Sequence, residues 1–443
     1  MRDIRWIATL LAAVATLLAL DASPAHADGA PAGTDIHVSQ SLGERELTVV
    51  LRRVDVVPGP LRVDVVTHAG SPAGTLTLRL GAGVATVRLG ATPGTYGATL
   101  RVDRPGTQEL LLDDGSTVAS IPFVVPAVVL TTAETLTYYG FAAAGLLLLG
   151  ALGASLLARR AWPAHVATSG LAAALGVAVT AATLSRPVPA PAPVPRPPVT
   201  LLTSSEPAGD GVTLVRLSFT DSASGRPVDD LIVHDAAFVH LLVVTPDRAL
   251  RHVHPVRTRP GEYEVHLATP QPGHYTLTAE VARSGGGPQL LRSPVGFEVA
   301  GSTSATAPDT AQARVSNTAQ AQVPVTISGR RAGEPTTISA NFGEADLQPW
   351  LGMVGHLIAV GPLPPDAPAT AVQDAQVWAH VHAMGPRPDI GAQPPDESVA
   401  DLGPEVSFTH TFALPGRYQL WMQVQRNYAL ITVPVVLEVG APR

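Results

Sequence analysis

The strongest constraint on this chain is a block of sequence that occurs twice, at residues 230–254 and 346–382. In each copy an Asp-Leu pair is followed, ten residues after the Asp, by a histidine inside an apolar run, and then by a His-x-His pair. Each copy has the pattern of two consecutive strands, so we expect the same β-hairpin to occur twice in the chain. The histidines are His240, His252 and His254 in the first copy, and His356, His380 and His382 in the second.

A second repeat divides the chain into domains. The turn Pro-Gly-x-Tyr occurs at 93–96, 272–275 and 415–418, and each Tyr is followed six residues later by a Val. A Tyr at the start of a strand, with its ring buried and its hydroxyl on nearby backbone, suits the corner of a sandwich. The 42 Pro and 40 Gly also favour many short strands joined by turns. We therefore expect a mostly β protein with three Ig-like antiparallel β-sandwich domains, at 28–126, 200–299 and 323–443.

The N-terminus has the pattern of an export signal. Residues 1–27 contain two arginines, an apolar run from Ile7 to Leu20, and an Ala-His-Ala cleavage site. We expect a signal peptide here and place the following domain outside the cytoplasm. The alternative is an uncleaved anchor.

Two uncharged apolar segments, at 136–158 and 164–184, separate the first sandwich from the second. Each is long enough to span a bilayer as a helix, and Arg159 and Arg160 between them favour a cytoplasmic turn. Small residues such as Gly150 and Gly176 are expected to let the two helices pack closely. A Pro-rich linker at 185–199 and a flexible Ser/Thr/Ala/Gln-rich linker at 300–322 complete the domain plan.

Composition excludes several kinds of function. The chain has no Cys, so disulfides and thiolate chemistry are absent. A net charge of −7 gives no basic face for a nucleic acid. We find no nucleophile elbow, phosphate loop or zinc-protease motif, and therefore do not expect an enzyme.

The repeated histidines point to metal binding. Residues i and i+2 of a strand face the same side, so the two histidines of each His-x-His project together. His240 joins His252 and His254 if the hairpin loop beginning at Thr245 has an odd length, because a shift of one residue in register changes the face. Three neutral imidazoles suit Cu(II), Zn(II) or Ni(II), and the general order of affinities favours copper, with zinc second.

The second copy adds sulfur. Met384 follows His382 at i+2 and Met353 precedes His356, and a thioether is a ligand that selects Cu(I). Asp230 and Asp346 are candidates for carboxylates that orient an imidazole, although turn or cap roles are commoner. We interpret His234, His266 and His410 as surface residues.

Other interpretations stay open at this point. A His-x-His pair can lie on a solvated strand face, and a histidine in a hairpin can bond a carbonyl without binding metal. Met384 can pack as an adaptable apolar filler. A cell-envelope module for structure or protein interaction, without metal, is the alternative function.

The segment 346–357, Asp-Leu-Gln-Pro-Trp-Leu-Gly-Met-Val-Gly-His-Leu, with the later His-Val-His, resembles a known signature. It is similar to bacterial exported proteins with paired D-L-x-P-x-L-G-x-x-G-H-L and H-x-H-P β-sandwich repeats, close to YtkA-like domains and copper-handling periplasmic sandwiches. The resemblance covers residues 200–440 and is weaker in the first copy, where the Leu-Gly-x-x-Gly portion is absent. It implies the sandwich fold and export more firmly than a metal.

Together these patterns predict a protein of the cell membrane with its main domains on the extracytoplasmic side. Its expected partners are the membrane, a copper or similar ion and, in the alternative interpretation, an envelope protein.

Overall fold

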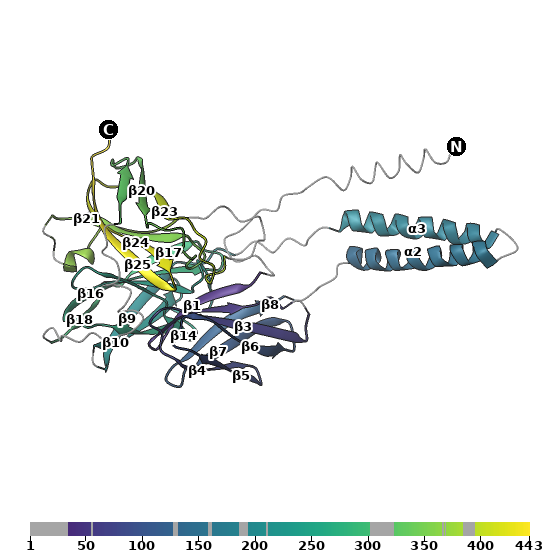
Figure 1. The fold of residues 1–443 in the computed structure, drawn as a ribbon, viewed down its shortest axis with the longest axis horizontal. Helices are drawn as coiled ribbons and strands as arrows, with labels where there is room; N and C mark the ends of the chain where they lie inside the picture. The colour runs from purple at the N-terminus through teal and green to yellow at the C-terminus, as the bar shows by residue number, and fades with distance from the viewer. Residues whose placement is uncertain are drawn as a thin grey trace.

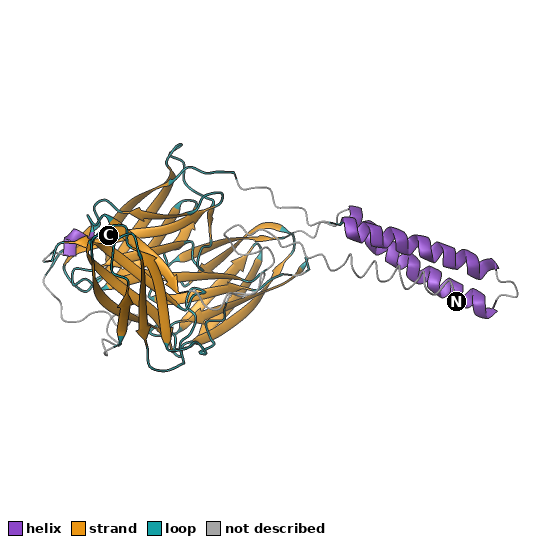
Figure 2. Cartoon of the chain, turned by 90° about the horizontal axis from the view of Figure 1, so that it is seen from above, coloured by secondary structure: helices purple, strands orange, loops and turns teal. Residues whose placement is uncertain are grey.

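The computed structural model describes residues 34–54, 56–126, 132–157, 162–185, 194–209, 211–301, 323–365, 367, 369–383 and 395–443. Three antiparallel β-sandwiches form a body of strands, and two helices lie side by side away from it (Figures 1 and 2). The predicted fold class is therefore confirmed. The proposed signal peptide at 1–27 and Met384 lie outside the described residues.

The first sandwich consists of two four-stranded sheets with the orders β1-β2-β3-β6 and β5-β4-β7-β8. Its strands alternate apolar and polar residues, and Gly or Asp-rich turns separate them. The strands are β1 (Ile36–Leu42), β2 (Arg45–Leu51), β3 (Gly59–Thr67), β4 (Gly74–Leu80), β5 (Gly83–Leu89), β6 (Gly94–Val102), β7 (Gly106–Asp113) and β8 (Val118–Val125).

The second sandwich has one sheet of order β14-β15-β10-β9 and a six-stranded sheet around β11-β16-β12-β13, with β17 and β18 paired to β16. Its strands are β9 (Val199–Gly209), β10 (Val212–Asp221), β11 (Leu231–Ile232), β12 (Val239–Val244), β13 (Leu250–Val253), β14 (Val256–Arg259), β15 (Glu262–Ala268), β16 (Gly273–Arg283), β17 (Pro288–Arg292) and β18 (Phe297–Val299).

The third sandwich repeats this plan with sheets of order β19-β20-β23 and β22-β21-β24-β25. Its elements are β19 (Val325–Ser328), β20 (Pro335–Asn341), β21 (Gly355–Leu363), the 3₁₀ helix η1 (Ala369–Val372), β22 (Val377–Ala383), β23 (Glu405–Thr411), β24 (Gly416–Arg426) and β25 (Ala429–Val439). By sequence and pairing, β12, β13 and β16 of the second sandwich correspond to β21, β22 and β24 of the third.

The central strands β12 and β21 are buried on both faces. One face of each, including Leu241 and Leu357, packs into the core of its own sandwich. The other face packs between the sandwiches, where Leu242 and Val244 share one apolar cluster with Ile358, Val360 and Trp421. The two histidine-bearing sheets therefore meet face to face, and the indole Nε1 of Trp421 donates to the carbonyl of Arg248 across this interface at 3.1 Å.

The first sandwich docks on the other two. Ser41 of β1 exchanges two hydrogen bonds with the backbone of His254, one of them through its hydroxyl, both 2.8 Å long. The buried Arg257 guanidinium binds Glu109 of the first sandwich as well as Asp229 of the second. The cores of the first two sandwiches form one continuous apolar cluster. These contacts make the three sandwiches a single packed unit.

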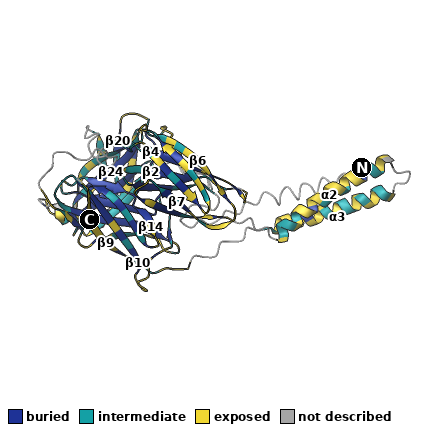
Figure 3. Ribbon diagram, turned by 90° about the horizontal axis from the view of Figure 1, so that it is seen from below, coloured by how far each residue is buried: buried dark blue, intermediate teal, exposed yellow. Residues whose placement is uncertain are grey.

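The helices are α2 (Thr132–Leu157) and α3 (Trp162–Leu184), and both are long and apolar enough to cross a membrane. Leucines along α2, such as Leu148 and Leu149, are exposed (Figure 3). The two helices come close together at Gly140 of α2, where an added Cβ would lie 2.8 Å from the Cβ of Ala178 in α3. Gly150 and Gly176 have no atom that close, so our assignment of those glycines to the helix contact is wrong. Gly170, another of the small residues in these segments, does lie at the contact, where an added Cβ would be 3.4 Å from the Leu147 side chain.

Candidate metal centre

Strand register brings each set of three histidines together. His240 lies on β12 opposite His254, which directly follows β13, and His252 faces the same side two residues earlier. In the third sandwich His356 on β21 pairs with His382 on β22, and Ile358 pairs with His380. The five residues between β12 and β13 give the odd-length loop that the predicted arrangement requires. In each set, one ring nitrogen per histidine lies within 4.8 Å of the others.

The two sets face each other between the sandwiches. We call His240, His252 and His254 the first triad, and His356, His380 and His382 the second triad. The ring centroid of His252 lies 5.2 Å from that of His380 and 5.7 Å from that of His356. All three rings of the first triad are buried, as is His356. A solvated strand face is therefore excluded for these histidines.

In the first triad, two nitrogens point at each other with no proton between them. The Nε2 of His240 is 2.9 Å from the carbonyl oxygen of His234, which can only accept, so this nitrogen carries the proton. The Nδ1 of His252 lies 3.1 Å from Oε1 of Gln423 and donates to it in the same way. Because a neutral imidazole has one proton, the Nδ1 of His240 and the Nε2 of His252 both present lone pairs, and they lie 3.1 Å apart.

The second triad has equivalent contacts. The Nε2 of His356 donates to the carbonyl of Trp350 at 3.1 Å, and the Nδ1 of His380 donates to the Glu280 carboxylate. The remaining nitrogens, Nδ1 of His356 and Nε2 of His380, lie 3.0 Å apart. Facing lone pairs repel each other unless a proton or cation lies between them. Two nitrogens bound tetrahedrally to one ion at about 2.0–2.1 Å would be about 3.3 Å apart, close to what is observed.

The third histidine of each triad has a buried ring nitrogen without a hydrogen bond in the described part of the chain. The Nε2 atoms of His254 and His382 are both buried, and neither has a hydrogen-bond partner among the described residues. An orphaned buried polar atom is costly unless a ligand satisfies it. In each triad one ring nitrogen of every histidine lies within 4.8 Å of the other two, which fits a metal ion chemically.

Burial keeps these imidazoles ready to bind an ion. It lowers the pKa of His240 to about 4, and it lowers the pKa of His252, His254 and His356 well below the usual value, with neighbouring imidazoles adding to the effect in each. The pKa of His382 is also lowered, mainly by burial. These five imidazoles are therefore neutral at neutral pH, the form that binds metals.

The groups around the two triads differ. Glu280 binds His380, and the carboxylate of Asp235 lies 3.5 Å from Nε2 of His382 and 2.9 Å from Nε2 of His234. The first triad instead contacts the uncharged side chains of Gln423 and Trp350. The indole of Trp350 lies at ring-centroid distances of 5.0 Å from His252 and 6.0 Å from His254.

Asp230 and Asp346, the candidate imidazole partners, instead bind arginines. Asp230 accepts from Nε of Arg283 at 2.7 Å, and Asp346 accepts from Nε of Arg426 at 2.6 Å. The physical reason is strand pairing, because Leu231, next to Asp230, lies opposite Arg283 on β16. The same carboxylate–arginine pair occurs in both copies. It holds the start of each repeat in place and does not orient an imidazole.

The sulfur ligands remain a prediction. Met353 is half-buried, and its backbone pairs with that of Trp350 through two hydrogen bonds, of 2.9 and 3.0 Å. Its place in the repeat corresponds to Ala237, which pairs in the same way with His234.

Several residues near the triads were not identified from the sequence. His234 is not a surface residue, since its side chain is only 22% exposed and binds Asp235 beside the second triad. His266 and His410 are partly exposed, on β15 and β23. Glu280 and Gln423 were also missed, although a signal was present. Each lies five residues after the repeated Tyr, directly before the Val that marks the repeat.

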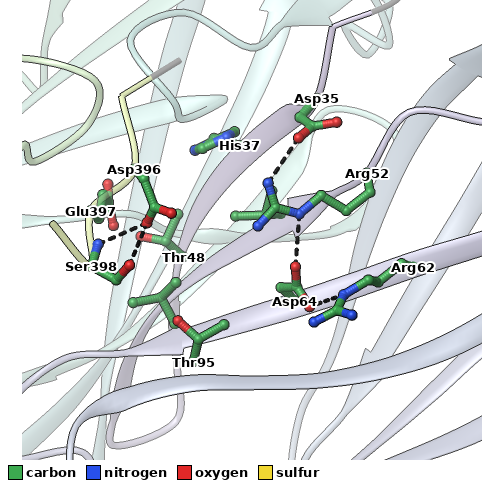
Figure 4. A pocket seen from close by; sticks show the side chains of 12 residues that line it. Asp35, His37, Thr48, Arg52, Arg62, Asp64, Thr95, Asp396, Glu397 and Ser398 are labelled. Carbon is green, nitrogen blue, oxygen red and sulfur yellow. Dashed lines mark hydrogen bonds and ion pairs between the residues drawn. The ribbon is translucent and has the colours of Figure 1, made fainter. Parts of the chain in front are cut away.

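A separate cavity of about 430 Å³ lies between the first sandwich and the loop at Asp396–Ser398 (Figure 4). In its lining Arg52 binds both Asp35 and Asp64, and Arg62 also binds Asp64. This cavity has no set of free ligand atoms comparable to the triads.

Among known proteins, the repeat matches one family model. The model described as "Domain of unknown function (DUF8832)" matches residues 200–290 and 313–441, which contain both triads. No protein among the curated ones matches the chain. The resemblance to YtkA-like domains remains an expectation.

Solved structures with similar β domains are distant. A tetra-tandem repeat from the extending region of a large adhesion protein is 10% identical, with 91% of this chain and 74% of that chain covered and a TM-score of 0.17. The chicken CNTN1 FN1–FN3 domains are 7% identical, with coverages of 87% and 97% and a TM-score of 0.15. A Salmonella alpha-2-macroglobulin mutant is 13% identical, with coverages of 92% and 24% and a TM-score of 0.17. At such scores these likenesses carry no argument about function.

Proposed function

We propose that this chain is a membrane-anchored, extracytoplasmic protein that binds copper or a similar ion, with one ion in each triad. The observation that carries the proposal is the pair of facing ring nitrogens in each triad, 3.1 and 3.0 Å apart, beside a third histidine whose buried Nε2 has no hydrogen-bond partner among the described residues. Imidazole sites suit copper, zinc and nickel, and the general affinity order places copper first. The two apolar helices support the anchor, and Arg159 and Arg160 between them favour the turn on the cytoplasmic side.

The proposed activity is binding rather than catalysis. A catalytic metal site keeps one position open to substrate. Here the triads lie where two sheets pack face to face, and both His252 and His356 are buried. Such a setting suits an ion that is held or passed on. The competing function, an envelope module without metal, assigns the histidines to packing between the sandwiches.

Metal content tests this proposal. The full-length protein, purified in detergent, is incubated separately with Cu(II) and Zn(II), desalted and analysed by inductively coupled plasma mass spectrometry. We expect about two ions per chain for the wild type and about one for His252→Asn or His380→Asn. His266→Asn and His410→Asn are matched controls, one in each sandwich, and should keep both ions.

Folding of each variant is checked by circular dichroism and gel filtration. A folded wild type that retains neither copper nor zinc would overturn the proposal and favour the packing role. Equal losses from all four variants would show diffuse surface binding and would also overturn it.

A further inference from the structure

The two triads are related by the repeat, but two pairs of equivalent positions differ in charge. Glu280 is paired with His240 between β16 and β12, and the equivalent Gln423 is paired with His356 between β24 and β21. Both side chains cross the interface: Glu280 binds His380, and Gln423 binds His252. The same structural role is thus filled by a carboxylate at the second triad and by an amide at the first.

The second pair of positions follows the start of each block. His234 and Trp350 are equivalent, since each lies four residues after the Asp of the repeat and each offers its carbonyl to the central histidine. The next residue is Asp235 in one copy and Leu351 in the other. Asp235 reaches across to His382, whereas Leu351 is fully buried in an apolar cluster with Trp350.

Both differences make the surroundings of the second triad more negative than those of the first. Glu280 and Asp235 lie against histidines of the second triad, while the equivalent contacts of the first triad come from the neutral side chains of Gln423 and Trp350. The same two carboxylates also act on His240 of the first triad, but without a hydrogen bond or ion pair to it. Exposure also differs, because the side chain of His382 is 17% exposed and the residue His254 only 3%. The first triad is therefore the drier and less negative of the two sites.

We propose that the second triad is the site for a divalent ion, Cu(II), and that the first triad is the site for Cu(I). The inference rests on the proposed function and specifies the oxidation state that each site prefers. An ion of charge +2 beside two carboxylates leaves no net charge to bury. The same ion among three neutral imidazoles would leave +2 in a dry site, which is far more costly than the +1 of Cu(I).

This assignment is the reverse of the one expected from methionine alone, which places Cu(I) in the second triad. The charged contacts decide in favour of the new assignment, because Glu280 and Asp235 touch histidines of the second triad directly. Carboxylates that orient and polarise a ligating imidazole commonly change metal affinity about 10–100-fold.

Exchanging the differing residues tests the inference in the full-length protein. Each site is isolated by disabling the other, with His252→Asn to leave the second triad and His380→Asn to leave the first. Cu(II) affinity is measured by competition with a chelator, and Cu(I) affinity by anaerobic competition with bicinchoninate. Before any exchange, the isolated second triad should favour Cu(II) more strongly than the isolated first triad does.

In the isolated second triad, Glu280→Gln combined with Asp235→Asn should weaken Cu(II) binding about 10–100-fold and change Cu(I) binding less than about threefold. In the isolated first triad, Gln423→Glu should strengthen Cu(II) binding about tenfold. Glu298→Gln, which removes a largely exposed carboxylate from the same sandwich as Glu280, is the matched control and should change neither affinity.

The outcomes separate the two proposals. If the wild type binds no copper, the proposed function fails and this inference fails with it. If copper binds but the exchanges leave both affinities unchanged, or shift Cu(I) and Cu(II) equally, only the assignment of oxidation states is overturned. The exchanged residues are nearly isosteric, and in Glu280→Gln the amide oxygen can still accept from His380. Circular dichroism should therefore show the native fold.

Discussion

At the scale of single residues, Glu397 places a buried carboxyl group at a contact between domains. Its carboxyl group is 2% exposed, between the first and third sandwiches. One oxygen accepts from the backbone N–H of Leu351 at 3.0 Å, and the other lies 3.7 Å from Nε2 of His68. Burial raises the pKa of Glu397 to about 7, and it lowers the pKa of His68 to about 4. Both groups are therefore biased toward their neutral forms.

Replacing Glu397 by Gln should make the protein more stable at high pH. The folded-state pKa of about 7 lies above the usual value of 4.5, so the native state holds a proton that the unfolded state releases between these values. This contribution is fully present below about pH 4.5 and is lost as the pH rises through 7. Urea unfolding should show the advantage of Glu397→Gln growing from near zero at pH 4 to at most about 3 kcal/mol at pH 8.

The pH dependence, rather than the absolute difference, is the decisive readout. Glu405→Gln, at an exposed carboxyl group of the same sandwich, should give a difference that does not change over this range. A constant difference for Glu397→Gln as well would contradict a buried, proton-holding carboxyl group.

At the scale of elements, the repeated Tyr fixes the same corner in every sandwich. The hydroxyl of Tyr275 donates to the carbonyl of Gln271 and that of Tyr418 to Leu414, both at 2.9 Å, and Tyr96 donates to Thr92 at 2.6 Å. In each case the acceptor lies four residues earlier in the chain. This bond could be predicted from the sequence, because the turn that precedes the Tyr is the same in all three copies.

Removing the Tyr hydroxyl tests how much this hydrogen bond stabilises the corner. Tyr418→Phe should lower the free energy of unfolding by about 1 kcal/mol, since its ring is fully buried and the Leu414 carbonyl loses a partner. Tyr96→Phe should cost less, because its hydrogen bond is exposed and water can replace the hydroxyl. Urea unfolding of both variants gives the comparison, and an equal or larger loss for Tyr96→Phe would contradict it.

The strands and the triads could be predicted from local patterns, but the meeting of the triads could not. Alternation and turns located most strands, and the i, i+2 rule placed His252 beside His254. The contact between His252 and His380 depends instead on which outer faces of two sandwiches pack together, and no local period encodes this. The sequence did contain a hint, since residues 241–244 are all apolar and a strand with both faces apolar needs a second neighbour.

For the whole molecule, the interface between the second and third sandwiches combines an apolar part with a histidine part. Leu242, Val244, Ile358 and Val360 supply the apolar part. The two triads beside it bury ring nitrogens at some cost, because lone pairs face each other in the first triad and Nε2 of His382 in the second lacks a hydrogen bond to any residue that the structure describes. An ion in each triad would satisfy those nitrogens and remove the repulsion. Each triad also bonds to a side chain of the opposite sandwich, so metal binding and interface formation should be coupled.

Copper should therefore stabilise the contact between the sandwiches as well as each site. Binding to the folded state at a free concentration 100 times the Kd adds about 2.7 kcal/mol per site. Differential scanning calorimetry of the full-length protein should show a higher unfolding temperature with copper than without it. The gain should persist at pH 6 and shrink as the pH falls toward about 4, because burial lowers the pKa of His240 to about 4 and protons compete with the ion in the folded site only there. The double variant His252→Asn with His380→Asn is the control and should show no gain. A wild type that binds copper without any rise in unfolding temperature would mean that the ion binds the unfolded chain equally well, which contradicts a site built by the packing of two sandwiches.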